Sequence, residues 1–264
     1  MLIEIDNVNK QFAVPGGTVD ALKDIDLNIG TGEFVCLLGP SGCGKSTLLN
    51  ALAGFVQPTS GVIRIDGRPD AAAEPGPDRG MVFQEYALFP WMTVAQNIAF
   101  GLEIKGMKRA EINERVDLLL GKLNLREFRD RFPRDLSGGM RQRVAIARVL
   151  ALDSPIMLMD EPFGALDALT RRTLQDELLR IWEEFKKTII FVTHSIEESI
   201  YLADRVVVMT YRPGTVKRDV VIDLPRPRDT AGSEFNELKK ELAQMVMEEQ
   251  MRFAQSEIRG VTAD

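Results

Sequence analysis

The sequence has few of the features that mark secreted, membrane-spanning or nucleic-acid-binding proteins. Only two of its 264 residues are cysteines, Cys36 and Cys43, so we expect two reduced thiols in an intracellular protein, not a disulfide framework. No apolar run approaches the roughly 20 residues that a membrane helix requires, so we do not expect the chain to cross a membrane by itself. A formal net charge of −6 with no Lys/Arg block argues against nucleic acid as a partner.

What remains is an ordinary globular composition, with 45% hydrophobic and 27% charged residues and no internal repeat. Strands alternate with helices, which favours a parallel sheet covered on both faces. The predicted strands are 2–5, 21–29, 34–38, 61–66, 156–159, 189–192 and 205–209, and the predicted helices are 46–53, 170–186 and 196–202.

Between residues 93 and 150 the apolar residues recur with helical spacing, as in the pattern around Val116, Leu119 and Leu120. We interpret this block as a helical insertion into the α/β core. The tail from Pro225 onward opens with an arginine- and proline-rich run and continues as one more amphipathic helix, with Phe235 and Leu242 on its apolar face.

A glycine-rich segment follows the apolar strand 34–38 and precedes a predicted helix: Gly39-Pro40-Ser41-Gly42-Cys43-Gly44-Lys45-Ser46. In that context it matches a phosphate-binding loop, whose backbone N–H groups and helix N-terminus bind phosphate oxygens. Lys45 is placed to reach the β- and γ-phosphates, and the Ser46 hydroxyl to ligate Mg²⁺. The alternative is a glycine-rich turn that precedes Lys-Ser by chance, and the motif alone does not choose among ATPases, GTPases and kinases.

Two further strand ends carry candidate catalytic groups. Asp160 and Glu161 close the apolar strand 156–159, where one carboxylate could reach the Mg²⁺ shell and the other the attacking water. The alternative without a catalytic role is a solvated acidic pair that ends the strand before Pro162. His194, the single histidine, follows strand 189–192 at what should be the same sheet edge and suits a hydrogen bond to the γ-phosphate, although a lone histidine is usually structural.

A second glycine-rich turn distinguishes this chain from other phosphate-loop proteins. Leu136-Ser137-Gly138-Gly139-Met140 precedes Arg141-Gln142-Arg143 and resembles the signature of the ATP-binding cassette family. Ser-Gly-Gly at the start of a helix can present hydroxyl and backbone donors to an anion, although a plain N-cap has the same sequence. The resemblance implies that this turn binds the γ-phosphate of ATP held by a partner chain.

Other motifs align with that family over about residues 2–225. The resemblance implies that Gln84 contacts Mg²⁺, that Ala165-Leu166-Asp167 meets the opposite subunit, that His194 is the switch histidine and that Phe12 stacks on adenine. Two positions depart from the common pattern: Met140 stands where glutamine is usual, and Phe12 where tyrosine is common. The implied site residues are Glu161, His194 and Gln84 for catalysis; Ser46, Gln84 and Asp160 for Mg²⁺; and Phe12, Gly39, Pro40, Ser41, Gly42, Cys43, Gly44, Lys45, Ser46, Thr47, Ser137, Gly138 and Gly139 for ATP.

Finer detail resembles the ATPases of nitrate, sulfonate and taurine importers. The segment 85–94, with Tyr86, Phe89 and Trp91, is similar to their sequence after the glutamine, and so are Arg212-Pro213-Gly214 and 222–228. The aromatic residues either form a groove for a membrane partner or pack the helical insertion, and the sequence leaves both readings open.

The resemblance implies a P-loop NTPase of the RecA-like α/β class, with an N-terminal antiparallel β subdomain and an inserted α-helical subdomain at about 88–155. The ATPase domain would span 1–225 and a helical tail 226–264. Implied partners are a second ATPase subunit, identical or paralogous, transmembrane permease subunits and, indirectly, a solute-binding protein. The implied location is peripheral, on the cytoplasmic face of the plasma membrane.

Two other functions are weighed against transport of a small solute. Non-transport cassette ATPases of DNA repair or translation generally carry coiled-coil insertions, zinc-type cysteine sets or two cassettes, and none of these is present in the sequence. A GTPase should carry an Asn-Lys-x-Asp guanine reader after the core strands; Asn9-Lys10 precedes the phosphate loop and lacks the Asp.

Overall fold

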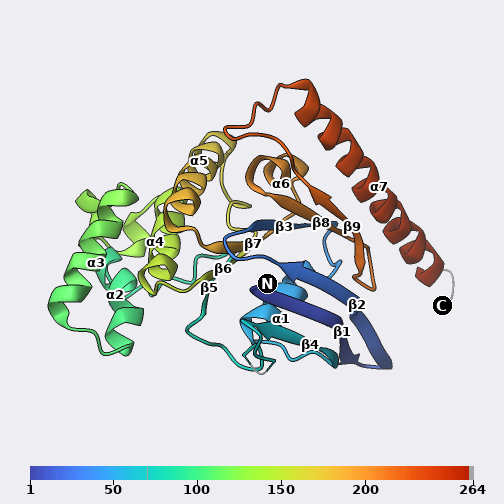
Figure 1. Cartoon of the computed structure of the whole chain (residues 1–264), viewed down its shortest axis with the longest axis horizontal. Coiled ribbons are helices and arrows are strands. Elements are labelled where there is room, and N and C mark those ends of the chain that lie inside the picture. Colours follow the sequence, from blue (N-terminus) through green and yellow to red (C-terminus); the bar gives the residue numbers. More distant parts are fainter. Residues whose placement is uncertain (70, 262–264) are drawn as a thin grey trace. The chain divides into compact units, whose positions relative to one another are not determined.

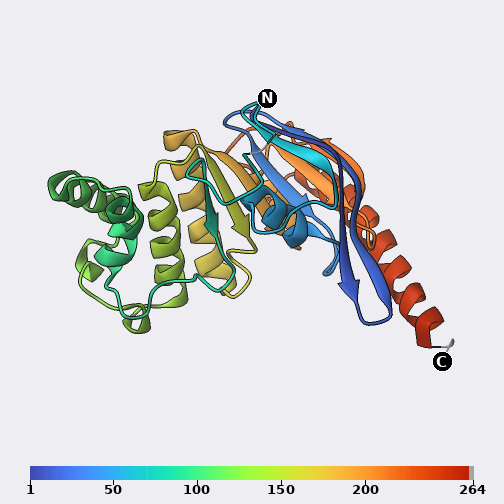
Figure 2. The same cartoon turned by 90° about the horizontal axis from the view of Figure 1, so that it is seen from below.

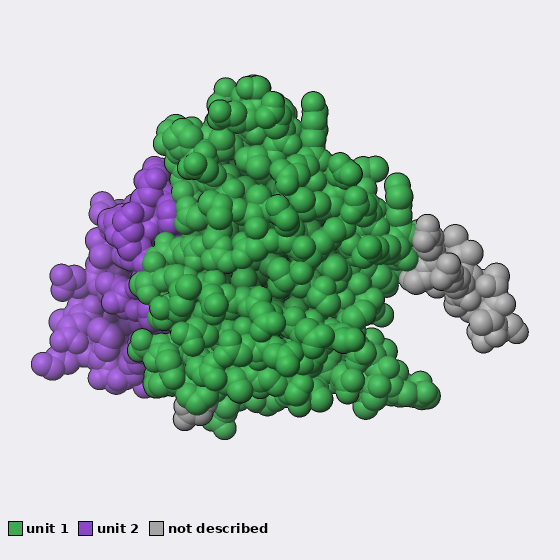
Figure 3. Space-filling model, turned by 45° about the vertical axis from the view of Figure 1, so that its right-hand side comes forward, with its two compact units in different colours: residues 1–76, 188–264 green, residues 77–187 purple. Residues whose placement is uncertain are grey.

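The computed structural model describes residues 1–69 and 71–261, with 255–261 described by backbone alone. It divides into two compact units: unit 1 comprises residues 1–76 and 188–264, and unit 2 comprises 77–187 (Figure 3). Unit 2 takes in the whole of the predicted helical insertion, 88–155, together with flanking segments, and the bounds of an inserted subdomain stay a prediction. The last three residues of the predicted tail, 262–264, lie outside the described part of the chain.

Unit 1 begins with an antiparallel sheet in the order β2-β1-β4, formed by β1 (Ile3–Val14), β2 (Gly17–Ile29) and β4 (Ser60–Ile65). The first strand is much longer than the predicted 2–5, which corrects that prediction. Only its first half alternates between buried and exposed residues, whereas 11–14 are exposed and are held by pairing across the hairpin, as in Val14 opposite Gly17. The turn predicted at 15–17 joins the two strands.

The second sheet of unit 1 carries the phosphate loop. Parallel strands β7 (Thr188–Thr193), β3 (Phe34–Leu38) and β8 (Arg205–Met209) lie in that order, and β9 (Val216–Val221) pairs with β8 in antiparallel direction. β3, β7 and most of β8 are buried, as uninterrupted apolar strands between helices should be. β9 was not predicted, because its Lys217-Arg218-Asp219 centre is polar and partly exposed, so neither alternation nor an apolar run marks it.

Among its described residues, unit 1 has three helices, and Figures 1 and 2 show two of them, α6 and α1, on opposite faces of the β3 region. α1 (Lys45–Ala53) packs against β2 and β7. It ends at Gly54 as predicted; this glycine has a left-handed φ of 81°, and its N–H donates to carbonyls of the last helical turn. α6 (Ile196–Leu202) packs on β3 and β7. α7 (Ser233–Val261) packs on α6 and β8, with its predicted apolar residues Phe235 and Leu242 buried.

The run that opens the predicted tail is a structural cap. The Arg228 guanidinium, 4% exposed, donates hydrogen bonds to the carbonyls of Ile200, Tyr201 and Ala203 at the end of α6, as well as to those of Ile222 and Leu224. Burial, and secondarily the charge of Arg226, lower the pKa of Arg228 to about 10. The carbonyls that end a helix lack partners within it, so this arginine satisfies a buried helix terminus.

Unit 2 contains a parallel pair of strands, β5 (Arg79–Val82) and β6 (Ile156–Asp160). β5 was also not predicted: it has four residues, and its Gly80 packs so close to α4 that a Cβ there would lie 2.4 Å from Val149. The helices are α2 (Val94–Ile104), α3 (Arg109–Lys122), α4 (Gly138–Ala151) and α5 (Ala168–Phe185), with 3₁₀ turns η1 (Arg126–Phe128) and η2 (Pro133–Asp135). No helix among the described residues is long and apolar enough to span a membrane.

Candidate nucleotide site

The phosphate loop closes around its own lysine. Lys45 is 4% exposed, and its Nζ donates to the carbonyl oxygens of Gly39 at 2.8 Å and Pro40 at 3.0 Å. Gly42 and Gly44 adopt φ values of 77° and 96°, a left-handed conformation that side chains with a Cβ rarely adopt. Backbone oxygens of the loop therefore fix the position of a buried cation within it.

Neighbouring backbone approaches the loop too closely for side chains at two glycines. A Cβ at Gly44 would lie 2.7 Å from the Ala21 carbonyl oxygen of β2, and one at Gly39 would lie 3.0 Å from that of Met209 at the end of β8. Cys43 is buried, and burial raises the pKa of its thiol. Backbone of β2 and β8 therefore packs against the loop at these two glycines, which constrains its conformation.

The predicted histidine shares a sheet edge with the loop. Leu38 of β3 pairs with Thr193 of β7, so Gly39 and His194 follow adjacent strand ends, and His194 is exposed there. Thr193 Oγ1 bonds Glu198 and accepts a hydrogen bond from Ser195 N–H at 3.0 Å, which holds the backbone on both sides of the histidine. This is the sheet edge where ligands bind in open α/β folds.

Phe12 lies on β1, opposite Val19 of β2, and is 40% exposed. Lys10 Nζ lies 4.9 Å from the centroid of its ring. The same hairpin supplies Ala21 against Gly44, so the aromatic ring and the phosphate loop share one rigid support. A planar ring with exposed surface in this position suits stacking on a nucleobase.

In unit 2, three more predicted residues lie at one edge of the strand pair. Val82 of β5 pairs with Met159 of β6, so Gln84 and the Asp160-Glu161 pair leave the strands at the same end. A Cβ at Gly164 would lie 3.9 Å from both Gln84 Nε2 and Glu161 Oε2, so the amide and the carboxylate both approach Gly164. Glu161 has a φ of 42°, unusual for a residue with a side chain and typical of strained functional positions.

The Ser137-Gly138-Gly139 turn opens α4 as an N-cap. Ser137 is exposed, and its Oγ accepts a hydrogen bond from Met140 N–H at 3.3 Å. A Cβ at Gly139 would lie 2.8 Å from the Thr170 methyl group, and one at Gly138 would lie 3.2 Å from the Tyr86 hydroxyl and from Leu166. The glycines let α4 approach α5 closely, and the serine faces solvent.

The predicted contact loop 165–167 leads into α5. The Asp167 carboxylate caps that helix by accepting from Leu169 N–H at 3.1 Å and Thr170 N–H at 3.0 Å, and the bond to Thr170 contributes most to lowering the pKa of Asp167. Leu166 is buried next to Gly138, so this loop and the Ser-Gly-Gly turn form one surface of unit 2.

Two residues that the sequence analysis missed hold the aromatic segment 85–94. Arg148 of α4 donates to the carbonyls of Tyr86 at 3.2 Å and Ala87 at 2.6 Å, and Asn97, fully buried, bonds the backbone of Phe89 in both directions. Both lie within ordinary helical patterns, so no sequence signal identifies them. Trp91 is left 70% exposed.

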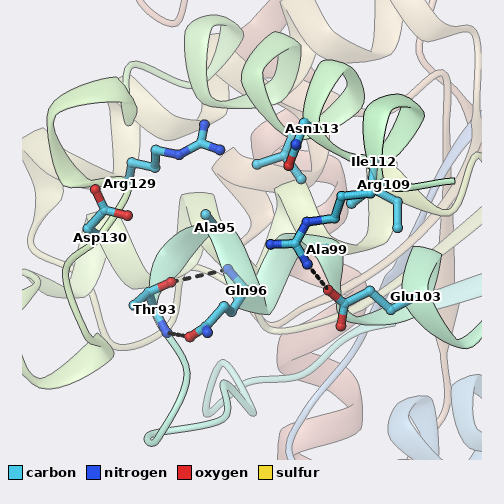
Figure 4. A pocket seen from close by; sticks show the side chains of 11 residues that line it. Thr93, Ala95, Gln96, Ala99, Glu103, Arg109, Ile112, Asn113, Arg129 and Asp130 are labelled. Atoms are coloured by element: carbon cyan, nitrogen blue, oxygen red, sulfur yellow. Dashed lines mark hydrogen bonds and ion pairs between the residues drawn. The ribbon is translucent and has the colours of Figure 1, made fainter. Parts of the chain in front are cut away.

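Unit 2 also contains a polar cavity of about 230 Å³ between α2, α3 and the loop at 129–130 (Figure 4). Its rim includes the ion pair Arg109–Glu103 and the capping pair of Thr93 and Gln96. None of the predicted site residues lines it.

The predicted residues therefore fall into two groups, each assembled within its own unit. Unit 1 holds the phosphate loop with Thr47, Phe12 and His194. Unit 2 holds Gln84, Asp160, Glu161 and the Ser-Gly-Gly turn. Chemically, the first group offers groups suited to bind phosphates and a nucleobase. The second offers a carboxylate that could accept a proton from water, oxygen ligands for a cation and a second turn suited to bind an anion.

Comparison with known proteins gives consistent matches. The family described as "ABC transporter" matches residues 22–164. A nitrate import ATP-binding protein of Synechocystis is 47% identical over 241 residues, covering 91% of this chain and 90% of that one. A taurine import ATP-binding protein of Jannaschia is 46% identical, covering 90% and 88%. A solved dimeric post-hydrolysis ATP-binding cassette bound to ADP and Pi has a TM-score of 0.75 at 35% identity, covering 85% of this chain and 100% of that one.

Proposed function

The chain belongs to the ABC transporter family of ATPases, and from that premise we propose that it powers a small-solute importer through a separate membrane permease. The observation that carries the proposal is the presence in one chain of two glycine-rich helix starts, one closed around Lys45 and one exposed at Ser137. ATP binding in unit 1 accounts for the first. A phosphate held by a second copy, or by a paralogue, accounts for the second.

In this proposal ATP lies on the phosphate loop, with adenine on Phe12 and the β- and γ-phosphates at Lys45. Backbone N–H groups of Gly42 to Thr47 and the N-terminus of α1 stabilise the anion. The loop carbonyls that bond Lys45 Nζ at 2.8 and 3.0 Å hold its positive charge within the loop, where it would attract the phosphates.

Hydrolysis is assigned to Glu161. Its carboxylate accepts a proton from the attacking water as the water oxygen bonds the γ-phosphorus, and the bond from the γ-phosphorus to the bridging oxygen breaks to leave ADP and phosphate. Gln84, at the same end of the strand pair as Glu161, orients the water, and His194 donates to the γ-phosphate.

The donor set fits Mg²⁺. A serine hydroxyl, a carboxylate and an amide oxygen are the hard ligands that Mg²⁺ takes alongside substrate phosphates and water. Ser46, Asp160 and Gln84 would hold it, and the strand pairing of β5 and β6 places the last two at one edge. When bound by these residues, the cation would supply positive charge that offsets the negative charge of the phosphates.

Dimerisation head to tail would place Ser137 and Gly138 of one subunit on the ATP of the other. The exposure of Ser137 and the dimeric state of the solved relative support this arrangement. Segment 85–94, with Trp91 exposed, would receive the permease on the cytoplasmic face of the membrane. Nitrate, sulfonate or taurine-like solutes, delivered by a solute-binding protein, are the proposed cargo, since the named relatives are nitrate and taurine import proteins.

The test is uptake in a strain whose gene for this chain is deleted. We expect loss of labelled nitrate, sulfonate or taurine uptake, restored by the wild type. Trp91→Ala should keep ATPase activity but fail to restore uptake, whereas Ile104→Ala, at a residue of matching exposure, 71% against 70%, should restore it. Unchanged uptake of all three solutes would refute the proposed cargo, and full rescue by Trp91→Ala would refute the permease surface.

A further inference from the structure

We propose that the C-terminal helix α7 sets the conformation of the phosphate loop through residues 211–214, with Glu249 as the positioning residue and Arg212 as the contact to the loop. This rests on the proposed assignment of ATP to that loop. Residues 211–214, here termed the bridge segment, connect β8 to β9 and lie with α7 and the loop in unit 1.

The α7 end of the bridge is a buried carboxylate. Glu249 is 0% exposed, and its Oε2 accepts a hydrogen bond from Tyr211 N–H at 3.0 Å. Its Oε1 accepts from Lys217 Nζ at 2.7 Å and from Arg252 at 3.1 Å. A charge is retained in such a place only when it is fully paired, so the carboxylate ties β9, α7 and the bridge backbone together.

Two further contacts strengthen that tie. The rings of Tyr211 and Phe253 lie 4.6 Å apart between centroids, in the range of favourable aromatic pairs. Lys217 also donates to Glu248 at 2.7 Å. Burial acts to lower the pKa of Lys217, but the hydrogen bonds to Glu248 and Glu249 outweigh it and raise the pKa overall, so the lysine stays charged.

The other end of the bridge touches the phosphate loop. Arg212 Nε donates to the Gly42 carbonyl at 3.3 Å, at the tip of the loop. Gly214 N–H donates to Ala21 at 3.1 Å, and a Cβ at Gly214 would lie 2.2 Å from the Cys43 carbonyl oxygen. Bridge and loop are therefore in close backbone contact at Gly214 and Cys43.

Tyr211, which bonds Glu249, is next in the chain to Arg212, which bonds the loop, so a shift of the Tyr211 backbone also moves Arg212. Release of the Tyr211 amide from Glu249 lets Arg212 leave Gly42, and the loop then loses one of the contacts that fix its N–H directions. The effect falls on ATP affinity and not on the chemical step, because the base is Glu161 in unit 2. Arg212 and Glu249 should consequently act as one unit.

The test compares Glu249→Gln, Arg212→Ala and the double variant in full-length protein. We expect each single change to raise the KM for ATP about 3- to 10-fold, the worth of one hydrogen bond, with kcat within about twofold. The double variant should be no worse than Arg212→Ala, since coupled residues are not additive. Arg212→Lys, which keeps a donor, should restore part of the affinity.

Two matched controls separate positioning from stability. Met247→Ala, at an exposed position on the same helix, and Arg218→Ala, at an exposed position on β9, should leave the KM unchanged. If Glu249→Gln does not fold, Phe253→Leu weakens the ring contact alone and should still raise the KM. Multiplicative effects in the double variant, or a lower melting temperature with unchanged KM, would overturn the proposal. If Lys45→Ala also leaves ATP affinity intact, the loop is not the triphosphate site and the proposed function fails, so the two failures can be told apart.

Discussion

Two glycine-rich turns open helices in this protein, and they are built in opposite ways. The turn before α1 wraps around a lysine that is 4% exposed and is in contact with backbone from β2, β8 and the bridge segment. The turn before α4 has its glycines against α5 and Tyr86, while its serine side chain is exposed and bonded only to its own helix among the hydrogen bonds described for it.

Under the proposed function, this difference decides which turn can bind phosphate without a second surface. Under the proposed function, the loop that holds a buried lysine binds a triphosphate within its own chain. An N-cap serine with exposed donors supplies only part of a site and contributes when another surface brings the phosphate to it. Both turns have a serine and glycines before a helix. In the proposed function, the residues packed around each turn decide whether it binds phosphate alone or together with a second subunit.

The first prediction concerns a substitution that removes the proposed general base and leaves both glycine-rich turns unchanged. Glu161→Gln should slow ATP hydrolysis by about 10²–10⁴-fold, the usual worth of a positioned base, with ATP affinity unchanged. Single-turnover hydrolysis and equilibrium nucleotide binding measure the two effects separately. Turnover near the wild-type rate would remove Glu161 from the mechanism.

The second prediction breaks the closed turn. Lys45→Ala should weaken ATP binding about 10- to 100-fold, because it deletes a hydrogen-bonded cation facing the phosphates. Lys240→Ala, which removes an exposed lysine from α7, is the charge-matched control and should bind normally. Equal affinities for the two variants in isothermal titration would show that the loop is not the triphosphate site.

The third prediction tests the exposed turn. Ser137→Ala should leave ATP binding by the monomer unchanged but weaken ATP-driven dimerisation about tenfold, since one charge-assisted hydrogen bond to a partner's phosphate is lost. Thr93→Ala removes an N-cap bond of the same 3.3 Å length from α2. Both variants should lose about 1 kcal/mol of stability, and only Ser137→Ala should impair dimerisation in sedimentation velocity.

The smallest effect concerns Cys43 within the closed turn. Only the thiolate is alkylated, and burial raises the pKa of this thiol, so its alkylation should be slow at neutral pH and should rise only above the ordinary thiol pKa of about 8.5. The measurement uses iodoacetamide on a Cys36→Ala protein, with Lys240→Cys as an exposed comparison. Equal rates for the two thiols at pH 7 would contradict the burial of the loop.

The sequence predicts most strands and helices near the loop because each has one strong signal. Strand 34–38 is wholly apolar, strand 205–209 is nearly so, and Gly54 ends α1 as expected. The sequence does not predict β5 and β9, because their pairing depends on the adjacent strands β6 and β8 and not on a pattern in their own residues. The same limit applies to Glu249, Arg148 and Asn97. Each is a polar residue inside a helical pattern, and only the fold shows which backbone groups it holds.

The claim that each ATP site is shared between two copies has one direct test. Ser137→Arg and Glu161→Gln should each slow hydrolysis strongly in a homodimer, because every site carries a lesion. In a mixed dimer both lesions fall in one composite site and the other is whole, so mixing the inactive proteins should restore activity, up to about half per mixed dimer if the sites are independent. Sedimentation in ATP, run alongside, should show dimers. Hydrolysis by a strict monomer at every concentration, or dimers with no recovery on mixing, would contradict the shared site.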